Sequence, residues 1–137
     1  MRALLLVLVI LAVAGLCFKI PSGRAQIEEN RLRALRHAFP TAPDLQQVFS
    51  DFSFRVGLSS YTDQERKVVY IQMSGEAGDF DEESVRRVFV HELVHAAGYA
   101  DHSREFWDVL QKFEARAEAS GFLTPGGGID ATYPSCL

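Results

Sequence analysis

The chain has 137 residues and a mass of 15.3 kDa, and its 47% apolar and 23% charged residues are typical of one small globular domain. Its two cysteines are too few for a disulfide scaffold. The formal net charge is -4, and residues 37–137 hold eight basic against sixteen acidic side chains. This acidic balance argues against nucleic acid as a partner of that part of the chain.

The N-terminal region begins with an apolar segment, residues 3–18, that contains no charged side chain. As a helix this segment spans about 24 Å, and extension through Ile20 brings it close to the roughly 30 Å of a bilayer core. We therefore predict an N-terminal hydrophobic helix within residues 1–23 that anchors the protein in a membrane by a single pass. The alternative is a cleaved signal peptide, because Arg2 supplies a basic start and Gly23–Ala25 loosely fits a cleavage site; the protein would then be secreted.

The remaining residues, 24–137, are expected to form an α+β domain. Apolar residues at near-helical spacing predict a helix over 24–38 and one or two helical turns over 45–49. Two segments rich in Val, Tyr and Ile, 54–60 and 66–73, predict strands that a polar turn joins into a short antiparallel sheet.

Two longer helices are predicted in the second half of the chain. The first runs over about 79–97 and ends before Gly98, and the second runs over 103–120 with its N-terminus capped by a serine. One stripe of the second helix is apolar, and Trp107 beside this stripe is interpreted as a core residue. The C-terminal segment after residue 123 is expected to be irregular.

Three of the four histidines fall within residues 91–102. His91-Glu92-Leu93-Val94-His95 is an HExxH motif within a predicted helix, where positions i and i+4 share one face, so both imidazoles can reach the same ion. Glu92 is offset by about 100° and can contact a water on the metal rather than the metal itself. His37 stands alone on a polar helix and is interpreted as an ordinary surface residue.

A catalytic zinc needs a third protein ligand, and two candidates follow the motif. His102 is well placed if the chain turns back at Gly98. Asp101 is the alternative, because HELVHAAGYAD also fits the pattern HExxHxxGxxD. The ligand preferences of zinc favour His102, and Asp101 then either orients an imidazole or is solvated.

The stretch HELVHAAGYADHSREFW resembles the SprT-like and WLM-type zinc metallopeptidases, and the likeness to the minimal WLM-like proteins of large DNA viruses extends over about residues 54–137. The resemblance implies a small zincin-like fold, in which a short sheet packs on the HExxH helix and a C-terminal helix. It also implies that His91, His95 and His102 bind one Zn²⁺ per chain and that Glu92 is the catalytic residue.

The metzincins, which would use Asp101 as the third ligand, match less well. They carry a methionine turn downstream of the histidines, whereas this chain has only Met1 and Met73, both upstream.

The expected function is zinc-dependent hydrolysis of peptide bonds, with Glu92 as the general base for the metal-activated water, by a protease tethered through residues 3–18. Tyr99 and Tyr133 are candidate oxyanion donors, and an extended peptide or protein substrate is expected to pair with a sheet edge at 66–73. Two alternatives remain: a secreted metzincin-like protease, and a non-catalytic metal-binding module that recruits a partner to a membrane.

Overall fold

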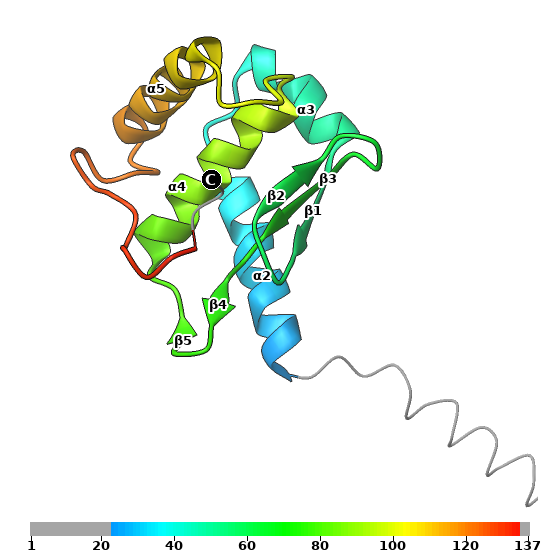
Figure 1. Ribbon diagram of the computed structural model, residues 1–137, viewed down its shortest axis with the longest axis vertical. Helices are drawn as coiled ribbons and strands as arrows, with labels where there is room; N and C mark the ends of the chain where they lie inside the picture. The colour runs from blue at the N-terminus through cyan, green and yellow to red at the C-terminus, as the bar shows by residue number, and fades with distance from the viewer. Residues whose placement is uncertain (1–22, 135–137) are drawn as a thin grey trace, which may run out of the picture.

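The computed structural model describes residues 23–134 (Figure 1). The predicted N-terminal hydrophobic helix therefore lies outside the described residues. Within residues 23–134, no helix is both long and apolar enough to cross a membrane.

The first described elements are helical, as predicted. Helix α2 (Gly23–Ala38) is followed by the short 3-10 helix η1 (Pro43–Leu45) and by α3 (Gln46–Asp51). One member of the predicted apolar stripe of α2, Ile27, is 61% exposed, whereas the leucines further along the helix are buried. Helix α2 thus contacts the domain mainly through its second half.

The sheet is mixed rather than antiparallel. Strands β1 (Ser53–Val56), β2 (Tyr61–Asp63) and β3 (Val68–Ile71) are arranged in the order β1-β3-β2. Strand β3 is parallel to β1 and antiparallel to β2. The predicted strand 54–60 is correct only as far as Val56, because residues 57–60 form a loop that leads to β2 on the other side of β3.

Gly57 explains this crossing. A Cβ at this position would lie 2.9 Å from the carbonyl oxygen of Ser59 and 3.0 Å from the Cβ of Tyr70, so the backbone can pass this close to β3 only without a side chain. The segment 66–73 consequently supplies the central strand, and the prediction that it offers a sheet edge is also wrong. The outer strands are β1 and β2.

A second, two-stranded sheet follows the main one, in a segment where the sequence predicts no strand. Strands β4 (Ser74–Gly75) and β5 (Gly78–Asp79) pair as a tight antiparallel hairpin. This hairpin leads the chain from the main sheet to the next helix.

The two long helices match the prediction. Helix α4 (Glu82–Ala96) is capped by the side chain of Asp81, and α5 (Arg104–Ala119) is capped by Ser103. Between them Gly98 adopts φ +114°, a conformation that favours glycine, and reverses the chain. The segment after α5 has no regular structure up to residue 134, as expected.

Helix α4 occupies the centre of the fold, with the β1-β3-β2 sheet on one side and α5 on the other (Figure 1). This small α+β arrangement buries α4 along most of its length, and its polar side chains must therefore find partners inside the protein. Apolar residues from every layer meet around it, among them Leu35, Phe39, Val69, Ile71, Phe89, Leu93, Phe106 and Phe122.

Candidate metal centre

The three predicted histidine ligands converge in the structure. His91 and His95 lie on successive turns of α4, and the chain reversal at Gly98 brings His102 back to them. The Nε2 atom of His102 lies 3.0 Å from that of His91 and 3.2 Å from that of His95. Three imidazole nitrogens therefore point at one place, at the end of α4 where the loop to α5 begins.

This spacing fits a metal ion. Zinc–nitrogen bonds of about 2.0–2.1 Å place the ligand atoms of a tetrahedral site about 3.3 Å apart, close to the distances between these nitrogens. Within residues 23–134, His91, His95 and His102 form the only group of three or more histidine, cysteine or acidic side chains arranged to hold a metal ion. The three histidines thus constitute a cluster that can bind one.

The protonation of the cluster also suits metal binding. The Nδ1 atom of His95 lies 2.7 Å from the carbonyl oxygen of Tyr99; because a carbonyl only accepts, Nδ1 must donate, which leaves Nε2 with its lone pair. Burial lowers the pKa of His91 to about 4, and repulsion from the other two imidazoles adds to this effect. Burial lowers the pKa of His95 as well. At neutral pH both rings are uncharged.

Glu92 lies next to the cluster and is fully buried. Its Oε2 accepts a hydrogen bond of 2.8 Å from Oγ1 of Thr62. Its Oε1 has no partner, and it is the one buried side-chain oxygen or nitrogen within the described part of the chain in this condition. Burial raises the pKa of Glu92 to about 7, although the bond from Thr62 opposes the rise. A carboxylate so placed can accept a proton at about neutral pH.

A small open cavity of about 170 Å³ joins these groups. Strand β2 and the turn after it form one wall, and the loop between α4 and α5 forms the other. Its lining residues are Tyr61, Thr62, Gln64, Glu92, His95, Ala100 and His102. An outer strand, Glu92 and two candidate metal ligands therefore line the same cavity.

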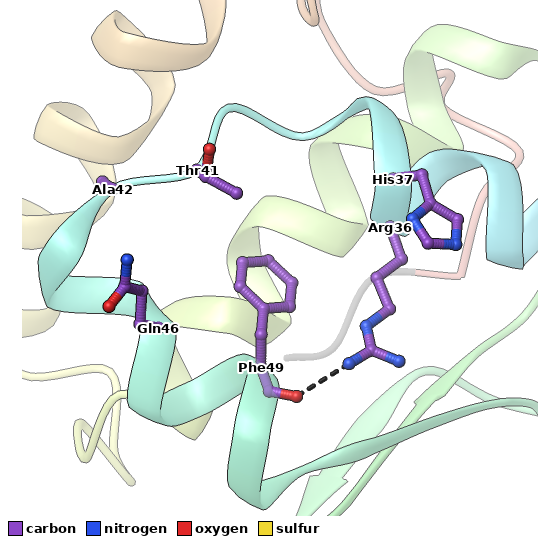
Figure 2. A pocket seen from close by; sticks show the side chains of 6 residues that line it. All are labelled: Arg36, His37, Thr41, Ala42, Gln46 and Phe49. Atoms are coloured by element: carbon purple, nitrogen blue, oxygen red, sulfur yellow. Dashed lines mark hydrogen bonds between the residues drawn. The ribbon is translucent and has the colours of Figure 1, made fainter.

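A larger cavity of about 340 Å³ lies between α2 and α3 (Figure 2). His37 lines it beside Arg36, whose guanidinium donates a hydrogen bond of 2.7 Å to the carbonyl oxygen of Phe49. His37 is exposed and stands apart from the metal cluster, which agrees with its interpretation as a surface residue. Size alone does not identify the functional cavity, because the grouped donors lie at the smaller one.

Asp101 does not join the cluster. It is exposed, and its charge acts on the site only by opposing the fall in the pKa of His95. The structure thus groups His102, and not Asp101, with the two motif histidines.

The prediction that Trp107 belongs to the core is wrong. Its side chain is 49% exposed, and its ring stacks on His102 with centroids 5.7 Å apart and planes inclined by 27°. The neighbouring Phe106 takes the core position, fully buried, with its ring 4.6 Å from that of His95. One turn of helix can direct only one of two adjacent aromatic rings inward, and Phe106 is that ring.

The two tyrosines proposed as oxyanion donors have other contacts. The hydroxyl of Tyr133 donates to the carbonyl oxygen of Gln72 at 2.5 Å and lies 2.9 Å from Oγ of Ser60. Tyr99 serves the site through its carbonyl group, and its ring packs against the core. Neither side chain lines the cavity.

Sequence reasoning missed two residues of the site, Thr62 and Gln64. Gln64 donates from Nε2 to the carbonyl oxygen of His95 at 2.6 Å, so both residues join β2 to the end of α4 that carries the motif. They lie in a segment that the sequence indicates is a simple polar turn, and nothing in its composition points to contacts with residues 30 and 31 positions further along the chain.

Comparison of the chain with models of protein families, with curated proteins and with solved structures finds no significant match. The likeness to SprT-like and WLM-type metallopeptidases therefore stays a prediction from the motif.

Proposed function

We propose that the protein is a zinc-dependent metallopeptidase of zincin-like fold, tethered to a membrane through residues 3–18. One observation carries this proposal: Glu92 is buried with its Oε1 unpartnered, and it lines the same cavity as His95 and His102 of the histidine cluster. A buried carboxylate oxygen without a partner is costly to the fold, and its presence next to a metal cluster supports a chemical role.

His91, His95 and His102 would hold the zinc, and three protein ligands leave one tetrahedral position for water. When bound, zinc supplies Lewis acidity, which activates that water and polarises a peptide carbonyl. Oε1 of Glu92 accepts the proton of the attacking water and then transfers it to the leaving amine. The elevated pKa of Glu92 suits both transfers.

The wall formed by β2 supports an extended peptide as the substrate. Strand β2 is an outer strand, paired with β3 on one side only, and it borders the cavity that contains Glu92. An extended chain laid along it would bind through its backbone, with little dependence on sequence. This edge replaces the segment 66–73 that we expected from the sequence.

The test is cleavage of unfolded casein by the purified, zinc-loaded protein. Glu92→Gln preserves the shape of the side chain but removes the base, and we expect it to reduce the rate by about 10²- to 10⁴-fold while zinc stays bound. Asp101→Ala is the matched control, because it removes a neighbouring carboxylate that lies outside the cluster. Equal cleavage by Glu92→Gln and the unmodified protein would refute the proposal.

A further inference from the structure

We propose that Thr62 is a positioning residue, which fixes the orientation of the Glu92 carboxylate in the wall of the cavity that His95 and His102 also line. This inference rests on the proposed function and adds a residue from the sheet to a site that the motif places on one helix.

The contact between the two side chains is direct. Oγ1 of Thr62 lies 2.8 Å from Oε2 of Glu92 and 3.1 Å from the backbone carbonyl oxygen of the same residue. A hydroxyl has one proton to donate, and the shorter distance and the charge of the acceptor favour the carboxylate. Thr62 is thus a hydrogen-bond donor to one oxygen of the pair.

No other residue in the described part of the chain holds this carboxylate. Oε1 has no partner, and Oε2 has only Thr62. A glutamate side chain turns about three bonds, so without a donor the carboxylate can adopt another orientation in the cavity wall. The orientation of the Glu92 carboxylate therefore depends on one hydrogen bond, the one from Thr62.

The strand keeps Thr62 itself in place. Thr62 pairs with Val69 of the central strand, and Val69 is fully buried. Its neighbour Tyr61 pairs with Tyr70, and these two rings stack with centroids 4.8 Å apart. Because successive side chains of a strand point to opposite faces, this stack fixes the face from which Thr62 reaches α4.

The test uses acetohydroxamate, a small ligand that binds zinc as an anion and gives up its proton to a nearby base. Its dissociation constant is measured by calorimetry on the full chain, solubilised in detergent and loaded with one zinc. We expect Thr62→Val, which keeps the shape and removes the donor, to weaken binding about tenfold. Thr62→Ser keeps the hydroxyl and should stay within twofold of the unmodified protein.

Three further variants make the result specific. Thr41→Val changes an exposed threonine at the α2–α3 cavity and should have no effect. In a Glu92→Ala background, Thr62→Val should cause no further loss, since the two residues act as one unit. Thr62→Ala is measured beside Thr62→Val, so that a failure of the valine variant to fold does not decide the question.

Equal affinity of Thr62→Val and the unmodified protein would overturn the inference. So would a serine variant as weak as the valine variant, or a tenfold loss that persists without Glu92. If instead Glu92→Ala binds acetohydroxamate as tightly as the unmodified protein, Glu92 does not act on a zinc ligand and the proposed function fails with it.

Discussion

In the first half of α4 the buried polar side chains all have partners, whereas in the second half the carboxylate of Glu92 keeps one oxygen without any. The two halves lie on one helix, in one core, and differ in what their polar groups contact. The first half has every buried polar group bonded, whereas the second half, although Thr62 and Gln64 join it to β2, retains one unpartnered carboxylate oxygen and the motif histidines of the candidate metal cluster.

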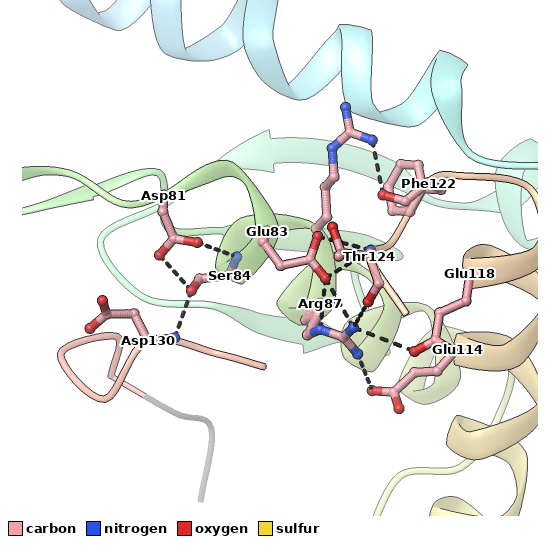
Figure 3. A network of polar contacts seen from close by, with 10 residues as sticks. Asp81, Glu83, Ser84, Arg87, Glu114, Glu118, Phe122, Thr124 and Asp130 are labelled. Carbon is pink, nitrogen blue, oxygen red and sulfur yellow. Dashed lines mark hydrogen bonds and ion pairs between the residues drawn. The ribbon is translucent and has the colours of Figure 1, made fainter. Parts of the chain in front are cut away.

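Arg87 is the main polar contact of the first half (Figure 3). This buried arginine donates to the carbonyl oxygen of Thr124 at 2.7 Å and forms ion pairs with three carboxylates. The carboxylates belong to α4 and α5, and the carbonyl to the C-terminal segment; they are those of Glu83, Glu114 and Glu118. One side chain thereby joins three parts of the chain.

Ser84 is equally well satisfied. Its hydroxyl donates to the carboxylate of Asp81 at 2.6 Å and accepts a hydrogen bond of 2.7 Å from the backbone N–H of Asp130 (Figure 3). A fully bonded buried group stabilises the fold, while a partly bonded one is retained at a cost. The contrast shows that hydrogen bonding explains the burial of Ser84 and Arg87 but not that of Glu92, which supports the chemical role proposed for Glu92.

The largest effect on folding is expected from Arg87→Met. It removes a buried cation from three partly buried carboxylates and the donor from the carbonyl group of Thr124, and we expect the free energy of unfolding to fall by about 3 kcal/mol in urea denaturation. Arg86→Met is the control, because Arg86 is only partly buried and should cost about 1 kcal/mol. Glu92→Gln should instead change the free energy of unfolding only slightly and cause a large loss of casein cleavage. A small loss of stability in Arg87→Met would contradict the contrast between the two halves of α4.

A smaller effect concerns Tyr133 and alkaline pH. Burial raises the pKa of Tyr133 to about 12, and the charge of Glu92 adds to the rise although the bond to Ser60 opposes it. The folded protein then holds a proton that the unfolded chain loses above about pH 10. Stability should be complete below pH 10 and fall by up to about 2.7 kcal/mol as the pH rises to 12.

Urea denaturation at several pH values measures this loss. Phenylalanine has no proton to lose in this pH range, so in Tyr133→Phe the free energy of unfolding should decline less steeply between pH 10 and 12. Parallel declines in the two proteins would contradict the account of Tyr133.

The smallest effect is expected at the start of α4. Asp81→Ala removes the cap that accepts the backbone N–H of Ser84 at 2.9 Å, and should lower the free energy of unfolding by about 1 kcal/mol. Ser103→Ala removes the corresponding cap of α5 and should cost a similar amount. Because His102 directly precedes Ser103, we expect Ser103→Ala to weaken zinc binding as well. Asp81→Ala should leave zinc binding unchanged. Equal zinc affinity in the two variants would count against this distinction.

The parts of the site that the sequence predicted depend on local geometry. The helical period alone brings His91 and His95 together, whereas the turn at Gly98 left both His102 and Asp101 as candidates and the ligand preferences of zinc favoured His102. Thr62 could not be predicted in this way, because it reaches Glu92 through a three-residue strand that shows no clear alternation of apolar residues. Pairing between distant strands leaves little local signal in a single sequence.

The errors in the fold have the same origin. The prediction of an antiparallel sheet assumed that neighbouring strands pair, whereas β1 pairs in parallel with β3 and the backbone crosses at Gly57. That glycine is an isolated residue within an apolar stretch, and its close approach to Tyr70 appears only in three dimensions. Trp107 was misplaced because a large aromatic side chain next to the apolar stripe was assumed to be buried with it, whereas only Phe106 lies on the buried face.

The most direct test of the metal centre is the zinc content of the purified protein, measured by mass spectrometry beside His102→Ala and Asp101→Ala. Trp107, the one tryptophan of the chain, stacks on His102, so its fluorescence should report the same binding during a zinc titration. The three-histidine site predicts about one zinc per chain, retained in Asp101→Ala and lost in His102→Ala. Zinc lost with Asp101 and kept without His102, or no zinc in the unmodified protein, would contradict it.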